Sequence, residues 1–188
     1  MSGKILRLRA LALTGMVCMA GCATPMEVAS ITEVRPTNGA QGLDVYAIRR
    51  QKGEQVPEFA GDQLLEVRTY AVIEGKGETE IAGGNCTVSG SDFQATTVSP
   101  ARVRVPLYRA QTRALSVSCT KDGYDQKSVV VEAFDTVRAG RMASGGSGGI
   151  IGLAVAVGAD ALADNTKNEW KYRQARLVMV AKGRAKTQ

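Results

Sequence analysis

The sequence predicts a mainly β protein, a small antiparallel β-sandwich with one glycine-rich helix near the C-terminus. Between residues 42 and 137, short segments alternate apolar and polar residues and are rich in β-branched side chains. Glycine, proline, serine and aspartate interrupt these segments at intervals of about 8 to 15 residues, which is typical of small sandwiches and barrels. One later stretch instead repeats small residues at helical spacing.

The expected strands follow from the alternation. Residues 42–50 are predicted to form a strand, and the polar stretch 51–62 is predicted to be a loop. Residues 64–75 alternate most clearly, which indicates a half-buried antiparallel strand. Its inward residues are expected to be Leu65, Val67, Thr69, Ala71 and Ile73. A hairpin connection is predicted at 75–79, and further β segments at 80–90, 93–107, 114–124, 126–137 and 175–181.

The first residues have the pattern of a processing signal. Three basic residues precede an apolar run, 10–20, which suits a signal peptide and is too short to span a bilayer as a helix. Two small residues then lead into Cys22. The stretch resembles the bacterial lipobox, although Met19 stands where leucine is more common. The resemblance implies acylation of Cys22 and loss of Cys18 with residues 1–21; an ordinary secretory signal with a chance cysteine is the alternative.

Composition excludes several classes of function. Without residues 1–21 the formal net charge falls from +6 to +3, with 21 basic against 18 acidic residues, so no nucleic-acid partner is expected. The sequence contains no histidine, which excludes Ser-His-Asp and Cys-His catalysis and the usual histidine-containing zinc sites. We therefore expect no enzyme activity, no metal and no cofactor.

Two cysteines remain for the folded domain. With Cys18 removed and Cys22 acylated, Cys86 and Cys119 are an even pair in an oxidising compartment, and a disulfide between them is expected. It would close a loop of about 33 residues and stabilise the fold by about 3–4 kcal/mol. Two free buried thiols are the alternative.

The run from 86 to 124 resembles the core of PEGA-like lipoproteins of Gram-negative bacteria. It contains a Cys-x-Val strand, a Ser-Pro turn, alternating valines, a strand that ends in Val-x-Cys, and a Lys-x-Gly-Tyr turn. The matching positions are Cys86, Pro100, Val103, Val105, Val117, Cys119, Gly123 and Tyr124. The literal Pro-Glu-Gly-Ala tetrapeptide is absent, and "IAGGNC" replaces the usual turn before the first cysteine. The resemblance implies a compact β-sandwich with a surface or carbohydrate-associated role.

The glycine-rich helix is predicted at 144–165. On a helix, one continuous stripe of small side chains would consist of Gly145, Gly149, Gly152, Ala156, Ala159 and Ala163. Such a stripe lets another backbone approach closely, either the domain's own sheet or a second copy or membrane surface. A strand at 150–157 is an alternative, because glycine and β-branched residues lower helix propensity.

Three segments follow: a signal peptide at 1–21, a tether at 22–41 that leads to a first strand or turn, and a sandwich domain at 42–188. The predicted function is that of a lipid-anchored lipoprotein on the periplasmic side of the outer membrane, with a structural or protein-interaction role. Its partners would be the membrane, through N-terminal acyl chains, and a protein partner or a second copy. The alternative is a module that binds glycan or peptide through a face that contains Arg102, Arg104, Tyr108 and Arg109.

Overall fold

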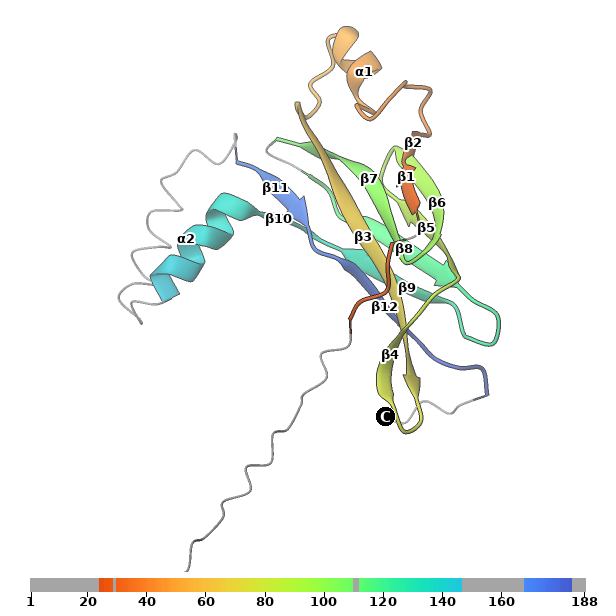
Figure 1. Cartoon of the computed structure of the whole chain (residues 1–188). Coiled ribbons are helices and arrows are strands. Elements are labelled where there is room, and N and C mark those ends of the chain that lie inside the picture. Colours follow the sequence, from red (N-terminus) through yellow and green to blue (C-terminus); the bar gives the residue numbers. More distant parts are fainter. Residues whose placement is uncertain (1–23, 29, 110–111, 147–167, 184–188) are drawn as a thin grey trace, which may run out of the picture.

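The computed structural model describes residues 24–28, 30–109, 112–146 and 168–183, and in these ranges two five-stranded β-sheets pack face to face (Figure 1). Sheet A consists of β1 (Ser30–Glu33), β3 (Phe59–Ile73), β4 (Gly77–Ile81), β7 (Ala101–Tyr108) and β12 (Ala175–Met179). Sheet B consists of β2 (Arg35–Pro36), β5 (Gly84–Ser89), β6 (Phe93–Ser99), β8 (Leu115–Thr120) and β9 (Lys127–Val131). The predicted mainly β sandwich is confirmed.

The strand order places long-range neighbours together. Sheet A runs β1-β7-β3-β12, with β4 also paired to β3, and sheet B runs β2-β6-β5-β8-β9. Most neighbours are antiparallel, but β1 pairs with β7 and β12 pairs with β3 in parallel. These two strands begin and end the domain, so no hairpin turn forces them to be antiparallel to their neighbours.

The core lies between the sheets and follows the predicted alternation. In β3, Leu65, Val67, Thr69 and Ala71 are buried, as expected for the inward face of this strand. The other sheet contributes Cys86, Val88, Leu115, Val117 and Cys119, and β7 and β12 contribute Val103, Val105 and Leu177. Burial of these aliphatic side chains is the main stabilising contribution, about 25 cal/mol per Å² of apolar surface.

Residues 42–50 do not form the predicted strand. They form a turn followed by the short helix α1 (Ala47–Gln51). The Asp44 carboxylate explains the difference, because it accepts a hydrogen bond from the Tyr46 main chain at 3.2 Å and one from the Arg50 side chain at 2.6 Å. Such local side-chain bonds favour a turn over a strand. The apolar side chains of Val45 and Tyr46 still reach the core.

Within the segment predicted as a tether leading to a first strand or turn, 22–41, residues 30–33 and 35–36 form two short strands. The short apolar piece in this range forms β1, which pairs along β7 from Ser30 opposite Ala101 to Glu33 opposite Arg104. The chain then pairs with sheet B as β2. The N-terminal segment joins the domain because an edge of each sheet offers it main-chain hydrogen bonds.

The predicted glycine-rich helix falls mainly on residues that the structure does not describe. Helix α2 (Thr136–Gly146) begins before the predicted start, since the Asp135 carboxylate accepts a hydrogen bond from the Arg138 main chain at 2.9 Å and caps its first turn. Of the predicted stripe, α2 contains only Gly145, and Gly149, Gly152, Ala156, Ala159 and Ala163 lie outside the described residues. Neither helix in the described ranges has the length and apolar composition that a bilayer span requires.

Candidate functional site

The two sheets meet along two seams, and these differ. We call the first the closed seam, where β9 and β10 (Ala133–Asp135) lie beside β11 (Trp170–Tyr172) and β12. We call the second the open seam, where the edge of sheet A is β1 and the edge of sheet B is β6 with the short β2. The candidate functional site is the open seam, because in the described part of the chain β6 has no strand partner on its outer side beyond Gln94 and contains no charged residue.

Main-chain hydrogen bonds join the closed seam at both of its ends. At one end β10 and β11 pair antiparallel (Figure 1). At the other, the Asp125 N–H donates to the Val180 carbonyl at 2.8 Å and the Lys182 N–H donates to the Gly123 carbonyl at 2.9 Å. These bonds join the two sheets at the ends of the seam, while between them, in the described ranges, β9 and β12 pair only with β8 and β3 of their own sheets.

The open seam is crossed by one strand that changes sheets. The Val34 N–H still donates to the Arg104 carbonyl in sheet A at 3.3 Å, but the Thr37 N–H donates to the Asp92 carbonyl in sheet B at 2.8 Å. Because of this change, β2 pairs with β6 only at Phe93 and Gln94. Farther along β6, a side-chain hydrogen bond from the Thr32 hydroxyl to Thr97, 3.1 Å long, links the two sheet edges.

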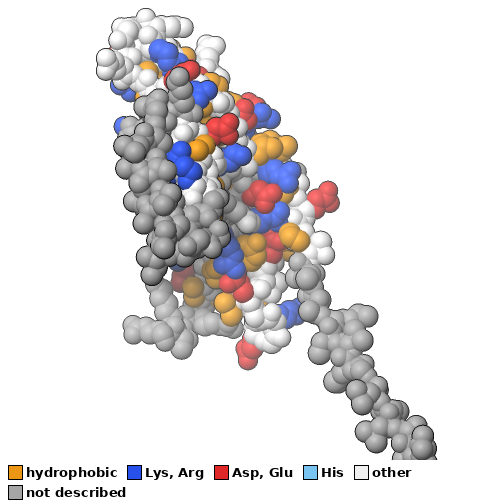
Figure 2. Space-filling view, turned by 90° about the vertical axis from the view of Figure 1, so that its left-hand side faces the viewer, with side chains coloured by type: hydrophobic (Ala, Val, Ile, Leu, Met, Phe, Trp, Pro, Cys, Tyr) orange, Lys and Arg blue, Asp and Glu red, His pale blue; other side chains and the backbone are white. Residues whose placement is uncertain are grey.

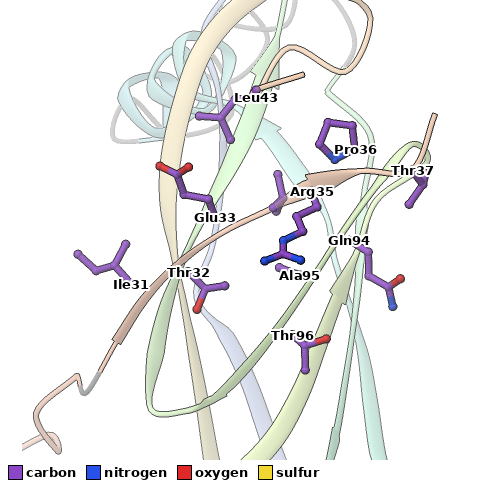
Figure 3. Close-up of a pocket in the computed structure, with 12 residues that line it drawn as sticks. Ile31, Thr32, Glu33, Arg35, Pro36, Thr37, Leu43, Gln94, Ala95 and Thr96 are labelled. Atoms are coloured by element: carbon purple, nitrogen blue, oxygen red, sulfur yellow. The ribbon is translucent and has the colours of Figure 1, made fainter. Parts of the chain in front are cut away.

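A groove of about 870 Å³ lies along this seam (Figure 3). Its walls come from the β1–β2 segment and from β6, and they combine the apolar side chains of Ile31 and Leu43 with the charged side chains of Glu33 and Arg35. A second hollow of about 500 Å³ continues along β6 and includes Val98. The two hollows leave space beside the edge of β6 for an added polypeptide segment.

A buried ion pair holds the chain where it enters this seam. Arg68 of β3 and Glu80 of β4 lie 2.7 Å apart, with side chains only 8% and 10% exposed. The Met26 N–H donates to Glu80 at 2.8 Å, and Arg68 donates to the Met26 carbonyl at 3.0 Å. The hydrogen bond to Glu80 raises the pKa of Arg68, so the guanidinium stays charged although it is buried. The pair thus binds both main-chain groups of one residue.

The face predicted to bind glycan or peptide is not assembled. Tyr108 is buried in the core, where its hydroxyl accepts a hydrogen bond from the Val45 N–H at 3.0 Å. Figure 2 shows acidic and basic side chains interspersed on the face that it draws, without a large patch of one sign. The three arginines have acidic neighbours: Arg102 with Glu66 at 3.2 Å, Arg104 with Asp62 at 3.1 Å, and Arg109 with Glu58 at 3.6 Å.

Three tyrosines fill one end of the core. The rings of Tyr46 and Tyr108 lie 4.8 Å apart, and the Tyr172 hydroxyl donates to the Arg113 carbonyl at 2.6 Å. Burial raises the pKa of both Tyr108 and Tyr172. The cavity beside them measures about 20 Å³, the size of one water molecule, so this end of the core serves the fold and has no room for a ligand.

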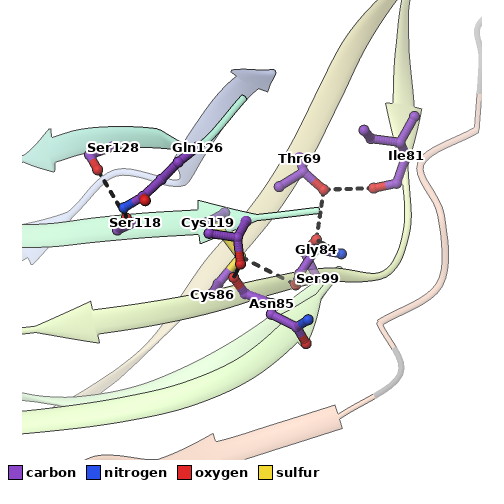
Figure 4. The surroundings of a disulfide bond; sticks show 11 residues. Thr69, Ile81, Gly84, Asn85, Cys86, Ser99, Ser118, Cys119, Gln126 and Ser128 are labelled. Atoms are coloured by element: carbon purple, nitrogen blue, oxygen red, sulfur yellow. Dashed lines mark hydrogen bonds between the residues drawn. A yellow bond between two sulfur atoms is a disulfide. The ribbon is translucent and has the colours of Figure 1, made fainter. Parts of the chain in front are cut away.

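The structure contains the predicted disulfide. Cys86 and Cys119 are bonded and lie directly opposite each other on β5 and β8, with Cα atoms 4.1 Å apart (Figure 4). Nearby, the hydroxyls of Thr69 and Ser99 lie 2.6 Å apart and connect the two sheets. A side chain at Gly84 would lie 2.8 Å from the Ser99 hydroxyl, which explains the glycine there.

Cys22, the predicted lipidation site, lies outside the described residues. Within the described ranges, no group of three or more histidine, cysteine, aspartate or glutamate side chains is placed to hold a metal ion. Comparisons with protein-family models, curated proteins and solved structures found no match to the chain. The resemblance to PEGA-like lipoproteins stays a prediction.

Proposed function

We propose that this protein is a lipid-anchored lipoprotein on the periplasmic side of the outer membrane, with a structural or protein-interaction role in the cell envelope. The anchor would be acylated Cys22. In the lipoproteins that the chain resembles, the residue after the acylated cysteine guides sorting, and Ala23, which is not aspartate, favours the outer membrane. The binding of Met26 by Arg68 and Glu80 is the observation that carries the proposal.

The position of Met26 limits how far the domain lies from its anchor. Met26 lies four positions after Cys22, and an extended chain covers at most about 3.6 Å per residue, so the reach is about 14 Å. The Arg68–Glu80 pair would therefore hold the sandwich beside the bilayer in a defined orientation. Buried ion pairs contribute little net stability, which fits a role in positioning the N-terminal segment.

An interaction role is supported by the open seam. The groove of about 870 Å³ and the free edge of β6 lie on the side where the N-terminal segment enters the domain. A sheet edge recognises another polypeptide through main-chain hydrogen bonds, independently of a catalytic side chain. The alternative glycan- or peptide-binding role loses its predicted face, because the arginines are paired and Tyr108 is buried.

The anchor is tested by replacing the two N-terminal cysteines separately. Cells that produce the full chain are given a clickable palmitate analogue, and labelling and membrane fractionation of the protein are measured. Cys22→Ser is expected to lose the label and to leave the membrane fraction. Cys18→Ser is the matched control and is expected to keep both, because Cys18 would be removed with the signal peptide. Unchanged labelling of Cys22→Ser would contradict the lipid anchor.

A further inference from the structure

Strand β6 has main-chain groups that face away from its sheet. The carbonyls of Phe93 and Ser99 accept hydrogen bonds from Gly90 and Gly83, on the side of β5. Because main-chain groups alternate sides along a strand, those of Thr96 and Val98 point to the opposite, open side. No strand in the described part of the chain pairs with them there, since β2 ends opposite Gln94.

This edge also lacks the usual protection against strand addition. Proteins commonly place charged residues or proline on exposed edge strands. The other strands of four or more residues at sheet edges contain such charges: Glu33 in β1, Glu78 and Glu80 in β4, Lys127 in β9 and Arg176 in β12. The sequence of β6, "FQATTVS", has no charged residue and no proline. Its exposed residues are Gln94, Thr96 and Val98.

We propose that two copies of this chain form a dimer in which β6 pairs antiparallel with β6 of the second copy. The pairing would join the two five-stranded B sheets into one continuous sheet. An uncharged edge suits a copy of itself, because the symmetric pairing brings no like charges together. The proposal uses only the sandwich domain and does not depend on the lipid anchor.

The main-chain groups of Thr96 and Val98 that face the open side of β6 define one register for this pairing. A two-fold axis at Thr97 places Thr96 opposite Val98 of the second copy, and Val98 opposite Thr96 of the second copy. Each of these two pairs exchanges two main-chain hydrogen bonds, so all the open groups of both strands find partners. Gln94 keeps its bond partner in β2, because it lies outside the paired residues. The side chain of Val98, 50% exposed in the single chain, would then pack beside Thr96 of the second copy.

The symmetry is compatible with two anchors in one membrane. Arg68 and Glu80 belong to the outward residues of sheet A, since their neighbours Thr69 and Ile81 pair on the inner face. Met26 therefore lies over the outer face of sheet A. A two-fold axis perpendicular to the sheets leaves both Met26 residues on the same side of the dimer.

Sedimentation of the full chain, extracted in a mild detergent, tests the dimer. The wild type is expected to sediment as a dimer. Thr96→Lys and Val98→Lys place like charges across the axis and are each expected to weaken dimerisation at least about tenfold. Val130→Lys, on β9 of the same sheet and 66% exposed in the wild type, is the matched control and should leave the dimer intact. An unchanged far-ultraviolet circular dichroism spectrum shows that each variant is folded, since the unfolding midpoint itself depends on dimerisation.

A site-specific crosslink adds a second measurement. Val98→Cys is expected to form a covalent dimer with a short bis-maleimide reagent, and Val130→Cys is not. A monomeric wild type, or a dimer that both lysine variants leave unchanged, would overturn the proposal. The same measurements on Cys22→Ser separate the two proposals, because this variant loses the palmitate label if the anchor is right and still dimerises if the β6 pairing is right.

Discussion

The two seams of this sandwich differ in the kind of hydrogen bond that joins the sheets. At the closed seam, main-chain bonds connect β10 to β11 at one end and the residues after β12 to the turn before β9 at the other. At the open seam, two residues of β2 and one hydrogen bond between Thr32 and Thr97 make the connection. Main-chain bonds hold the closed seam at both ends and its edge strands contain charged residues, whereas the open seam leaves the uncharged outer edge of β6.

The difference arises from how the chain reaches each seam. The strands of the closed seam continue out of the two sheets, so β10 follows β9 and β11 precedes β12. The open seam is closed by a single short N-terminal segment, which must change sheets at Val34 and so cannot pair with the full length of either edge. We expect amide hydrogen exchange to be slower at β10 and β11 than at β1 and at the outer edge of β6.

Removal of the disulfide is expected to have the largest effect, because it weakens the sheet that contributes to both seams. The double variant Cys86→Ala/Cys119→Ala opens a crosslink between residues 33 apart in sequence. Its free energy of unfolding in urea is expected to fall by about 3–4 kcal/mol. Cys18→Ser is the control and should leave the midpoint unchanged. A loss below about 1 kcal/mol in the double variant would show that the reduced chain is already constrained.

Asp135→Ala is expected to weaken the closed seam specifically. The substitution removes the N-cap of α2. It also removes the hydrogen bond, 2.6 Å long, that the Asn168 side chain donates to the Asp135 carboxylate. The expected loss is about 2 kcal/mol in the free energy of unfolding, with faster amide exchange in β10 and β11. Asp122→Ala, in an exposed turn, is the control and should change stability by less than about 0.5 kcal/mol. Equal effects of the two substitutions would contradict this role of Asp135.

High pH is expected to loosen the closed seam through Tyr172. Burial raises the pKa of Tyr172 and of Tyr108 above the ordinary value, so these groups stabilise the fold fully below about pH 10. Above that pH the unfolded chain releases protons that the folded chain retains, and stability falls by at most about 1.4 kcal/mol per pH unit for each tyrosine. Urea midpoints measured from pH 8 to pH 11 should fall less steeply for Tyr172→Phe than for the wild type. Parallel curves would contradict the assignment.

Thr32→Val is expected to have the smallest effect. It removes the one side-chain hydrogen bond that links β1 to β6, and the expected loss is about 1 kcal/mol or less. Amide exchange should become faster at the open seam and stay unchanged in β10 and β11. Thr79→Val, on β4, is a control that changes the same chemistry away from both seams. A larger loss than that caused by Asp135→Ala would reverse the comparison between the seams.

Where one face of a strand is buried, the local sequence pattern was sufficient to predict which residues point inward. The inward residues of β3 and the disulfide partners could be predicted, because alternation and cysteine number are properties of the sequence itself. The short helix α1 was missed, because Asp44 outweighs a strand-like alternation through local hydrogen bonds. The bounds and pairing of β1 and β2 could not be predicted, because two to four residues have no strong pattern and distant strands decide whether they pair.

The candidate site shows the same division. The sequence by itself determined the uncharged composition of β6 and the position of Cys22 close to Met26, since both are matters of residue type and spacing. Only the tertiary structure decided that β6 lies at a sheet edge and that Arg68 and Glu80 enclose the main chain of Met26. The physical reason is that an edge and a buried ion pair are defined by neighbours from distant parts of the chain. The change of sheet at Val34 leaves Thr96 and Val98 open.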